Sequence, residues 1–332
     1  MKLATLRGEG PDGRLVVVSR DGLRCLPARA IAPTLQAALE DWDSVSGRLK
    51  ALSEALDAGQ GEALEASVLA APLPRSWQWL DGSAFPTHAA LMQKAFKLPP
   101  IETDAPLMYQ VMSHQFLGPR DAVPAPSEAD GIDFEGEFGV ITDAVPMGVT
   151  AKEAADHIKL IVLLNDWSLR VIAPVEMKTG FGWVRAKPAC SVAPFAVTPE
   201  ELGAAWRDSR VCLDLRIDLN GQRFGAANGS AMEFGFDELV AHAAYSRNLP
   251  AGTIIGSGTV SNENCREVGS SCIAERRGIE LIDLGAAKTE FMRFGDRVRM
   301  EAEPVEGSSP FGAIEQPIVA MTSGRSTRPS SE

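Results

Sequence analysis

Three carboxylates at alternate positions in residues 131–139 restrict the fold more than any other feature of the chain. The segment has the sequence Gly-Ile-Asp-Phe-Glu-Gly-Glu-Phe-Gly, in which acidic and apolar residues alternate. Because side chains alternate across a β-strand, a strand here would place Asp133, Glu135 and Glu137 on one face. A solvated acidic edge strand has the same pattern, although the glycines of the segment would also let another group approach the backbone closely.

The remaining sequence favours an α+β protein that is mainly β. Asn220-Gly221 lies between two apolar runs and is typical of a hairpin turn, because both residues accept positive φ. Apolar runs bounded by Gly or Pro predict strands at 138–142, 211–219, 253–255, 271–275, 279–282 and 297–303. Helical periodicity and stop signals predict helices at 34–42, 45–58, 87–97, 150–157 and 236–245.

The domain organisation is expected to be a small N-terminal domain followed by a larger one. A chain of 332 residues exceeds the size, about 250 to 300 residues, at which single cores stop growing. Residues 1–70 predict two strands, 2–6 and 15–19, ahead of the first helices, and the proline-bearing segment 71–75 begins the larger domain, 71–322. The polar residues 323–332 are expected to form a disordered tail.

The charge and cysteine content exclude several classes of protein. Lys and Arg number 32 and Asp and Glu 44, so the net charge of −12 disfavours nucleic acid and anionic membranes as partners. Five cysteines without a C-x-x-C pair favour a reducing cytoplasm over a disulfide framework or a zinc ribbon. No apolar run is long enough to predict a membrane span.

Two further motifs place polar groups where chemistry could occur. The apolar run 161–164 ends in Asn165-Asp166, which could deliver a carboxylate on a rigid element, although a turn or helix-cap Asp is the simpler interpretation. Asp81 precedes His88 by seven residues, and the histidine is either a base or an ordinary surface or core residue.

These motifs would create an electrostatic problem if they converged. Two carboxylates about 4 Å apart repel by about 4 kcal/mol at an effective dielectric near 20, so either they bind protons or a cation joins them. All-oxygen ligation suits Mg²⁺, Ca²⁺ or Mn²⁺ better than zinc or copper. The candidate metal ligands are Asp81, Glu135, Glu137 and Asp166.

With these motifs in this order, residues 81 to about 300 resemble the fumarylacetoacetate hydrolase family. The resemblance rests on Asp-x6-His, Glu-x-Glu, Asn-Asp-x-Ser-x-Arg, Lys-x3-hydroxyl and Gly-Thr followed by an acidic strand. In this chain the motifs supply Asp81 and His88, Glu135 and Glu137, Asp166 and Arg170, Lys187 and Ser191, and Gly258, Thr259 and Glu275.

The resemblance implies a mixed β-roll catalytic domain, a homodimer and a Mg²⁺ or Ca²⁺ site, with Mn²⁺ as a further candidate. Lys187 and Ser191 would complete the metal site. His88 would activate water with Glu275 as its orienting partner, while Lys187 and Arg170 would complete the catalytic set. The substrate-binding residues would be Lys97, Tyr109, Arg170 and Thr259.

The implied activity is hydrolysis of a carbon–carbon bond in a β-diketone acid, foremost fumarylacetoacetate, to fumarate and acetoacetate, as in tyrosine degradation. Ala173, Met177 and Lys97 depart from the family's substrate-binding pattern, so the metal and the base look retained while the pocket differs. The alternatives are an acylpyruvate hydrolase, a 2-oxo acid decarboxylase, a 2-oxo-4-enoate hydratase or a tautomerase. A non-catalytic metal-binding protein on the same fold is a further alternative.

Overall fold

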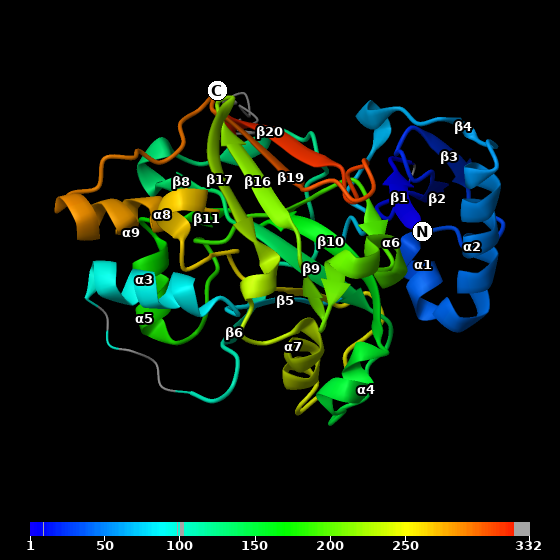
Figure 1. Cartoon of the computed structure of the whole chain (residues 1–332), viewed down its shortest axis with the longest axis horizontal. Helices are drawn as coiled ribbons and strands as arrows, with labels where there is room; N and C mark the ends of the chain where they lie inside the picture. The colour runs from blue at the N-terminus through cyan, green and yellow to red at the C-terminus, as the bar shows by residue number, and fades with distance from the viewer. Residues whose placement is uncertain (9, 98, 100–102, 322–332) are drawn as a thin grey trace, which may run out of the picture.

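The computed structural model describes residues 1–8, 10–97, 99 and 103–321, and it has the mixed, strand-rich α+β architecture that the sequence predicts. The N-terminal elements lie at one side of the molecule, and α3, α5, α8 and α9 gather at the opposite side (Figure 1). The predicted tail, 323–332, lies outside the described residues.

A large mixed sheet runs through both parts of the chain. Within the described residues it has eleven strands, in the order β4-β3-β2-β1-β13-β10-β9-β18-β5-β6, with β12 paired to β10. The N-terminal part supplies β1 (Lys2–Leu6), β2 (Arg14–Val18), β3 (Arg24–Pro27) and β4 (Glu62–Ala63). The rest of the chain supplies β5 (Trp79–Gly82), β6 (Met108–Val111), β9 (Gly136–Thr142), β10 (Ile158–Asn165), β12 (Ser191–Val192), β13 (Ala196–Val197) and β18 (Ile254–Gly256).

A second sheet covers one face of the large one (Figure 1). Its five strands in the described region are β7 (Val123–Ala125), β16 (Asp214–Leu219), β17 (Gln222–Asn228), β19 (Arg297–Ala302) and β20 (Ala313–Ala320). The predicted hairpin turn is confirmed, because Asn220 and Gly221 join β16 to β17 with φ of 51° and 76°. Two short pairs complete the strands: β8 (Ile132–Asp133) with β11 (Ser168–Leu169), and β14 (Trp206–Arg207) with β15 (Arg210–Val211).

Helices flank the sheets, and one of them begins with a capping box. Thr150 and Glu153 form a capping box at the start of α4, which satisfies backbone donors that a helix end leaves free. The helices are α1 (Leu35–Glu40), α2 (Trp42–Asp57), α3 (Pro86–Phe96), α4 (Ala151–Ala155), α5 (Ala173–Thr179), α6 (Pro199–Leu202), α7 (Phe236–Ala243), α8 (Cys265–Val268) and α9 (Ile273–Leu284). Short 3₁₀ turns occur at Ala66–Val68, Glu128–Asp130, Gly203–Ala205 and Gly229–Ala231. In the part of the chain that the structure describes, every helix is too short or too polar to cross a bilayer.

The strands predicted at 271–275 and 279–282 are wrong, because both segments belong to α9. Gly278, which separates the two apolar runs, lies inside the helix at its contact with α3, where an added Cβ would stand 2.8 Å from Leu91. The glycine therefore permits helix packing and does not mark a turn. Cys272 caps the helix, since its Sγ accepts a hydrogen bond from the Glu275 amide at 3.3 Å.

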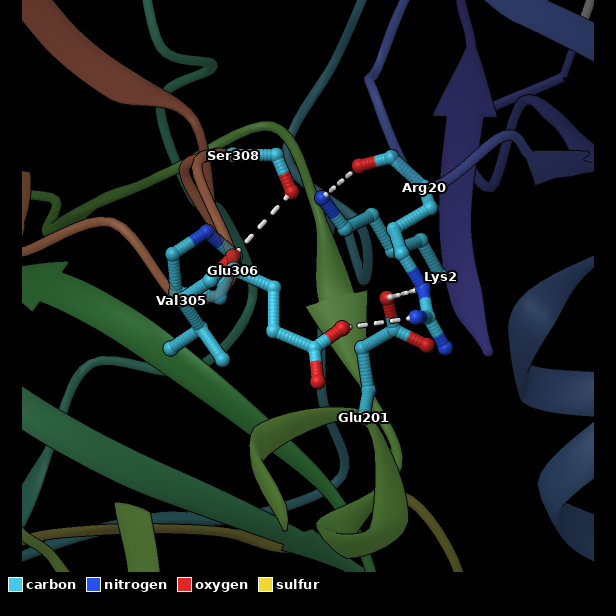
Figure 2. Close-up of a pocket in the computed structure, with 7 residues that line it drawn as sticks. Lys2, Arg20, Glu201, Val305, Glu306 and Ser308 are labelled. Carbon is cyan, nitrogen blue, oxygen red and sulfur yellow. Dashed lines mark hydrogen bonds and ion pairs between the residues drawn. The ribbon is translucent and has the colours of Figure 1, made fainter. Parts of the chain in front are cut away.

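The core has two parts, one on each face of the large sheet. Alternate residues of β10 enter them, with Leu163 in the core shared with the second sheet and Leu164 in the core shared with α1 and α2. A buried cation fixes one side of the contact between the N-terminal part and the rest. Lys2 Nζ donates a hydrogen bond to the carbonyl of Arg20 at 2.5 Å (Figure 2). It donates another to the carbonyl of Ser309 at 2.9 Å, and burial lowers the pKa of Lys2.

Candidate active site

Three of the predicted metal ligands meet at the ends of neighbouring strands. Asp81 lies on β5, Glu137 lies on β9 and Asp166 follows β10, and one ligand atom from each lies within 4.8 Å of the other two. All three side chains are buried. Gly256 of β18 lies between β5 and β9, and a Cβ there would fall 2.5 Å from Asp81 Oδ1. A residue without a side chain is therefore required for the carboxylates to approach.

In the acid group of Asp81, Glu137 and Asp166, the protein compensates the first two carboxylates poorly. Burial, together with the charge of Asp166, raises the pKa of Asp81 to about 7. Burial and Asp81 raise the pKa of Glu137 well above its ordinary value. Among the described residues, neither carboxylate oxygen of Glu137 has a hydrogen-bond partner. Buried oxygens of this kind fit a hard divalent cation, which would supply the missing positive charge.

Glu135, the fourth predicted ligand, lies in a different environment. Its carboxylate accepts hydrogen bonds from Lys187 Nζ and Ser168 Oγ, each at 2.6 Å, and from the Thr259 hydroxyl. Arg170 Nη2 stands 3.1 Å away. Although burial acts to raise the pKa of Glu135, Arg170 and Lys187 outweigh it and hold that pKa well below its ordinary value. The structure thus places Glu135 beside the acid group but with protein cations as partners.

Lys187 links Glu135 to the acid group. Its Nζ also lies 2.5 Å from Asp166 Oδ2, which accepts a second hydrogen bond from the Tyr109 hydroxyl at 2.8 Å. Burial alone would lower the pKa of Lys187, but Asp166 and Glu135 raise it above its ordinary value, so the ammonium stays charged. Burial and Asp166 raise the pKa of Tyr109, which keeps its hydroxyl protonated as a donor.

His88 and Glu275 form a pair at the contact between α3 and α9. His88 Nδ1 lies 3.3 Å from Glu275 Oε2, and the Ser261 hydroxyl donates to Glu275 Oε1 at 2.8 Å. Thr259, two residues before Ser261, bonds Glu135, so one short segment contacts both the pair and the carboxylates. The prediction that Glu275 lies on an acidic strand is wrong, because the residue lies in the first turn of α9.

The segment 131–139 is not the continuous strand that alternation predicts. The ladder of β8 ends at Asp133 and that of β9 begins at Gly136. Asp133 accepts hydrogen bonds from the amides of Ile273 and Ala274 at 2.7 and 2.9 Å, and it pairs with Arg170 Nε at 2.8 Å. A carboxylate at a helix N-terminus is favourable, so Asp133 anchors α9 and Arg170.

The last two predicted site residues, Ser191 and Lys97, make no hydrogen bond to the acid group among the described residues. The Ser191 hydroxyl accepts a hydrogen bond from the Trp167 indole at 2.9 Å, so its metal role stays a prediction. Lys97 is exposed and ends α3 in the left-handed conformation, with φ of 53°. Its proposed contact with substrate also stays a prediction.

Sequence reasoning missed two residues of the site. Cys190 donates its thiol hydrogen to Asp166 Oδ1 at 2.9 Å, although the cysteines were considered only for disulfides and zinc. The Trp183 ring packs edge-on against Tyr109, with centroids 4.2 Å apart, and lies 5.5 Å from Lys187 Nζ. Their positions near Lys187 in the sequence are the signal that could have found them.

A cavity beside Tyr109 has space for a small molecule. It measures about 300 Å³ and lies between the edge strand β6 and α7. Its walls include Leu80, Met108, Tyr109, Gln110, His242 and Arg247.

Part of this chain is similar in sequence to known proteins, and its fold is similar to that of solved structures. An alignment over 163 residues is 30% identical to 2,4-didehydro-3-deoxy-L-rhamnonate hydrolase of Sphingomonas sp. (strain SKA58), covering 48% of this chain and 54% of the relative. The chain thus spans about half the length of the curated relatives it matches.

Two solved structures share the fold at 18% sequence identity, each matched over 97% of this chain and 100% of its own length. They are maleylpyruvate hydrolase from Sphingobium sp. SYK-6, with a TM-score of 0.66, and 5-carboxymethyl-2-hydroxymuconate delta-isomerase from Mycobacterium smegmatis, with a TM-score of 0.57. The Sphingobium hydrolase was also crystallised with manganese(II) and pyruvate.

Two family models match successive parts of the chain. The model for the fumarylacetoacetate hydrolase C-terminal region matches residues 78–319, and a model for the fumarylacetoacetase N-terminal domain matches residues 1–75. Since the first of these alone covers well over half of the sequence, the chain belongs to the fumarylacetoacetate hydrolase family.

Proposed function

We propose that the protein is a divalent-metal-dependent hydrolase that cleaves a carbon–carbon bond in a β-diketone acid. The substrate is fumarylacetoacetate or an acylpyruvate such as fumarylpyruvate. The observation that carries the proposal is the His88–Glu275 pair, because Ser261 bonds Glu275 of this pair while Thr259, two residues earlier, bonds the proposed metal ligand Glu135. A base beside a metal site is the arrangement that hydrolysis requires.

The metal would be held by the acid group, with Glu135 as a fourth carboxylate. The unpartnered oxygens of Glu137 and the all-oxygen ligand set support Mg²⁺, Ca²⁺ or Mn²⁺. When bound, such an ion would act as a Lewis acid that polarises a carbonyl group of the diketone and stabilises the enolate product. Lys187, between Glu135 and Asp166, limits how far these two carboxylates separate.

His88 would act as the base. Because Glu275 accepts at Nδ1, the other nitrogen, Nε2, is left to remove a proton from water. The hydroxide formed in this way would attack the distal carbonyl and give a tetrahedral oxyanion, for which Lys187, Arg170 and Thr259 are the candidate stabilisers. The bond between the carbonyl carbon and its neighbour then breaks, releasing a carboxylic acid and an enolate that takes up a proton.

The pocket would recognise a terminal carboxylate through Lys97, Tyr109 and Arg170. Ala173 and Met177 replace polar residues of the family pattern, which supports a substrate other than the one for which the family is named. The acylpyruvate alternative also has support from the fold likeness to maleylpyruvate hydrolase, which was crystallised with pyruvate and manganese(II).

The test is the decay of absorbance of fumarylacetoacetate and fumarylpyruvate with purified protein, with added Mg²⁺ or Mn²⁺ and after chelation. We expect metal-dependent decay of at least one diketone. His88→Ala should lower kcat by about 10³-fold, the range for a positioned general base, while Mn²⁺ affinity stays unchanged. No decay of either diketone would contradict the proposal, and oxaloacetate and 2-hydroxypentadienoate would then test the decarboxylase and hydratase alternatives.

The protein is also proposed to be a homodimer, with the segment 171–184 in the interface. Five apolar side chains of this short segment are exposed: Val171, Val175, Met177, Phe181 and Val184. Concentrated apolar exposure of this kind is typical of a contact surface. Light scattering should give twice the chain mass for the native protein and a single chain mass for Phe181→Asp. Leu23→Asp, at an exposed leucine in the N-terminal part, should leave the dimer intact, and a monomeric native protein would contradict the proposal.

A further inference from the structure

Cys190 forms the middle of a hydrogen-bonded chain that ends on the acid group. The thiol is fully buried, accepts a hydrogen bond from Trp79 Nε1 at 3.2 Å and donates one to Asp166 Oδ1 at 2.9 Å. The other carboxylate oxygen, Oδ2, accepts from Lys187 and Tyr109. The two oxygens of Asp166 therefore have different donors: Oδ2 contacts an ammonium group and a hydroxyl, whereas Oδ1 contacts a weak thiol donor.

The chain of contacts connects two of the strands that form the site. Trp79 and Asp81 lie two residues apart on β5, so their side chains share one face, and Gly256 packs against both. Cys190 directly precedes β12, which pairs with the end of β10 just before Asp166. A bond from Trp79 through Cys190 thus ties the strand that carries Asp81 to the residue that follows β10.

The thiol is suited to orientation and not to metal ligation. The Cys190 thiol directs its hydrogen at Asp166 Oδ1, 2.9 Å away, while its sulfur accepts the indole hydrogen of Trp79. A hard divalent ion also prefers oxygen to sulfur. A weak donor fixes the orientation of a carboxylate while leaving most of its electron density to a metal.

We propose that Cys190 is a positioning residue, which holds the Asp166 carboxylate in the orientation needed for a divalent metal ion and is itself aligned by Trp79. This inference rests on the proposed metal site. Neither the short motifs of the family resemblance nor the likenesses to known proteins assign a role to this cysteine.

The experiment is a titration of the whole protein with Mn²⁺, in which free Mn²⁺ is measured by electron paramagnetic resonance. Cys190→Ala removes the donor, and we expect the Kd for Mn²⁺ to rise about tenfold, at the lower end of the effect of removing a partner of a metal ligand. Cys190→Ser keeps a donor and should stay within about threefold of the native Kd. Trp79→Phe keeps the ring but not its donor, and should raise the Kd in the same direction.

Cys25→Ala is the matched control, because Cys25 is a buried cysteine on β3 in the N-terminal part. It should leave the Kd unchanged. A native Kd in Cys190→Ala would overturn the inference, as would equal weakening in Cys190→Ser and Cys190→Ala. If Cys190→Ala does not fold, the Ser and Trp79→Phe variants decide the question. Failure of the native protein to bind Mn²⁺ would instead overturn the proposed metal site.

Discussion

Glu135 and Glu137 lie two residues apart and have the same chemistry, yet the protein surrounds them in opposite ways. Glu135 contacts Lys187, Arg170 and two hydroxyls, and its pKa is held low. Glu137 has no hydrogen-bond partner among the described residues, and its pKa is raised. A repeated acidic motif can therefore divide into one carboxylate that the protein neutralises and one that it leaves for a cation from outside.

The comparison predicts opposite effects on the stability of the metal-free protein. Glu135→Gln removes the carboxylate that Lys187 and Arg170 share and leaves each with one acidic partner, Asp166 and Asp133. It should lower the free energy of unfolding by about 3 kcal/mol, the lower end of the cost of breaking a buried ion pair. Glu137→Gln removes an uncompensated acid and should raise it. Because the folded-state pKa of Glu137 is raised, the cost of this residue is absent at low pH and grows as the pH rises above its unfolded value of about 4.5.

Urea unfolding in the presence of a chelator, at pH 5 and pH 8, measures both effects. The increase in the free energy of unfolding caused by Glu137→Gln should be larger at pH 8 than at pH 5. Destabilisation by both variants would show that the two environments are alike, and the comparison would fail.

With bound metal, Glu137 should stabilise the protein instead of destabilising it. Mn²⁺ at about 100 times its Kd should stabilise the native protein by about 2.7 kcal/mol, and Glu137→Gln should abolish most of this gain. The thermal midpoint with and without Mn²⁺ measures it, and a variant remote from the site, Cys25→Ala, should respond like the native protein. If Mn²⁺ raised the thermal midpoint of Glu137→Gln as much as that of the native protein, Glu137 would not be a metal ligand.

A third carboxylate, Glu176, differs from both Glu135 and Glu137, because its hydrogen bonds come from backbone amides at the surface. It accepts from the amides of Val184, Arg185 and Ala186, each at 3.0 Å, and these bonds lower its pKa. A lowered pKa stabilises above the unfolded value of about 4.5, and this contribution is lost as the pH falls. Glu176→Gln should therefore accelerate hydrogen exchange of these amides a few-fold at pH 7, with a smaller effect near pH 4. Equal effects at both pH values would contradict this account.

Sequence analysis indicated which carboxylates could meet better than it indicated the local structure around them. The order of the motifs grouped Asp81, Glu137 and Asp166 with Glu135, and the structure brings ligand atoms of the first three within 4.8 Å of one another, while their metal role stays a prediction. The environment of Glu135 could not be predicted, since it depends on Lys187 and Arg170 arriving from distant segments. The pattern of carboxylates in a sequence shows where acidic residues occur, but it does not show which cationic side chains will contact each of them.

The same limit explains the errors around α9. Gly278 looks like a boundary in the sequence, and only the approach of Leu91 from α3 shows that it belongs inside a helix. Cys190 could not be placed either, because its partners Trp79 and Asp166 are 111 and 24 residues away. Strands and hairpins with local signals, such as Asn220-Gly221, were predicted correctly.

The continuity of the large sheet affects how this protein could be divided. Lys2 and Leu3 of β1 pair with Val197 and Ala196 of β13, so the N-terminal part closes one side of the sheet that carries the acid group. Expression of residues 78–319 alone would leave β13 with an open edge and uncover apolar side chains such as Leu160, an arrangement that promotes aggregation. An exchange of N-terminal regions between relatives would accordingly have to preserve the register of this two-residue pairing.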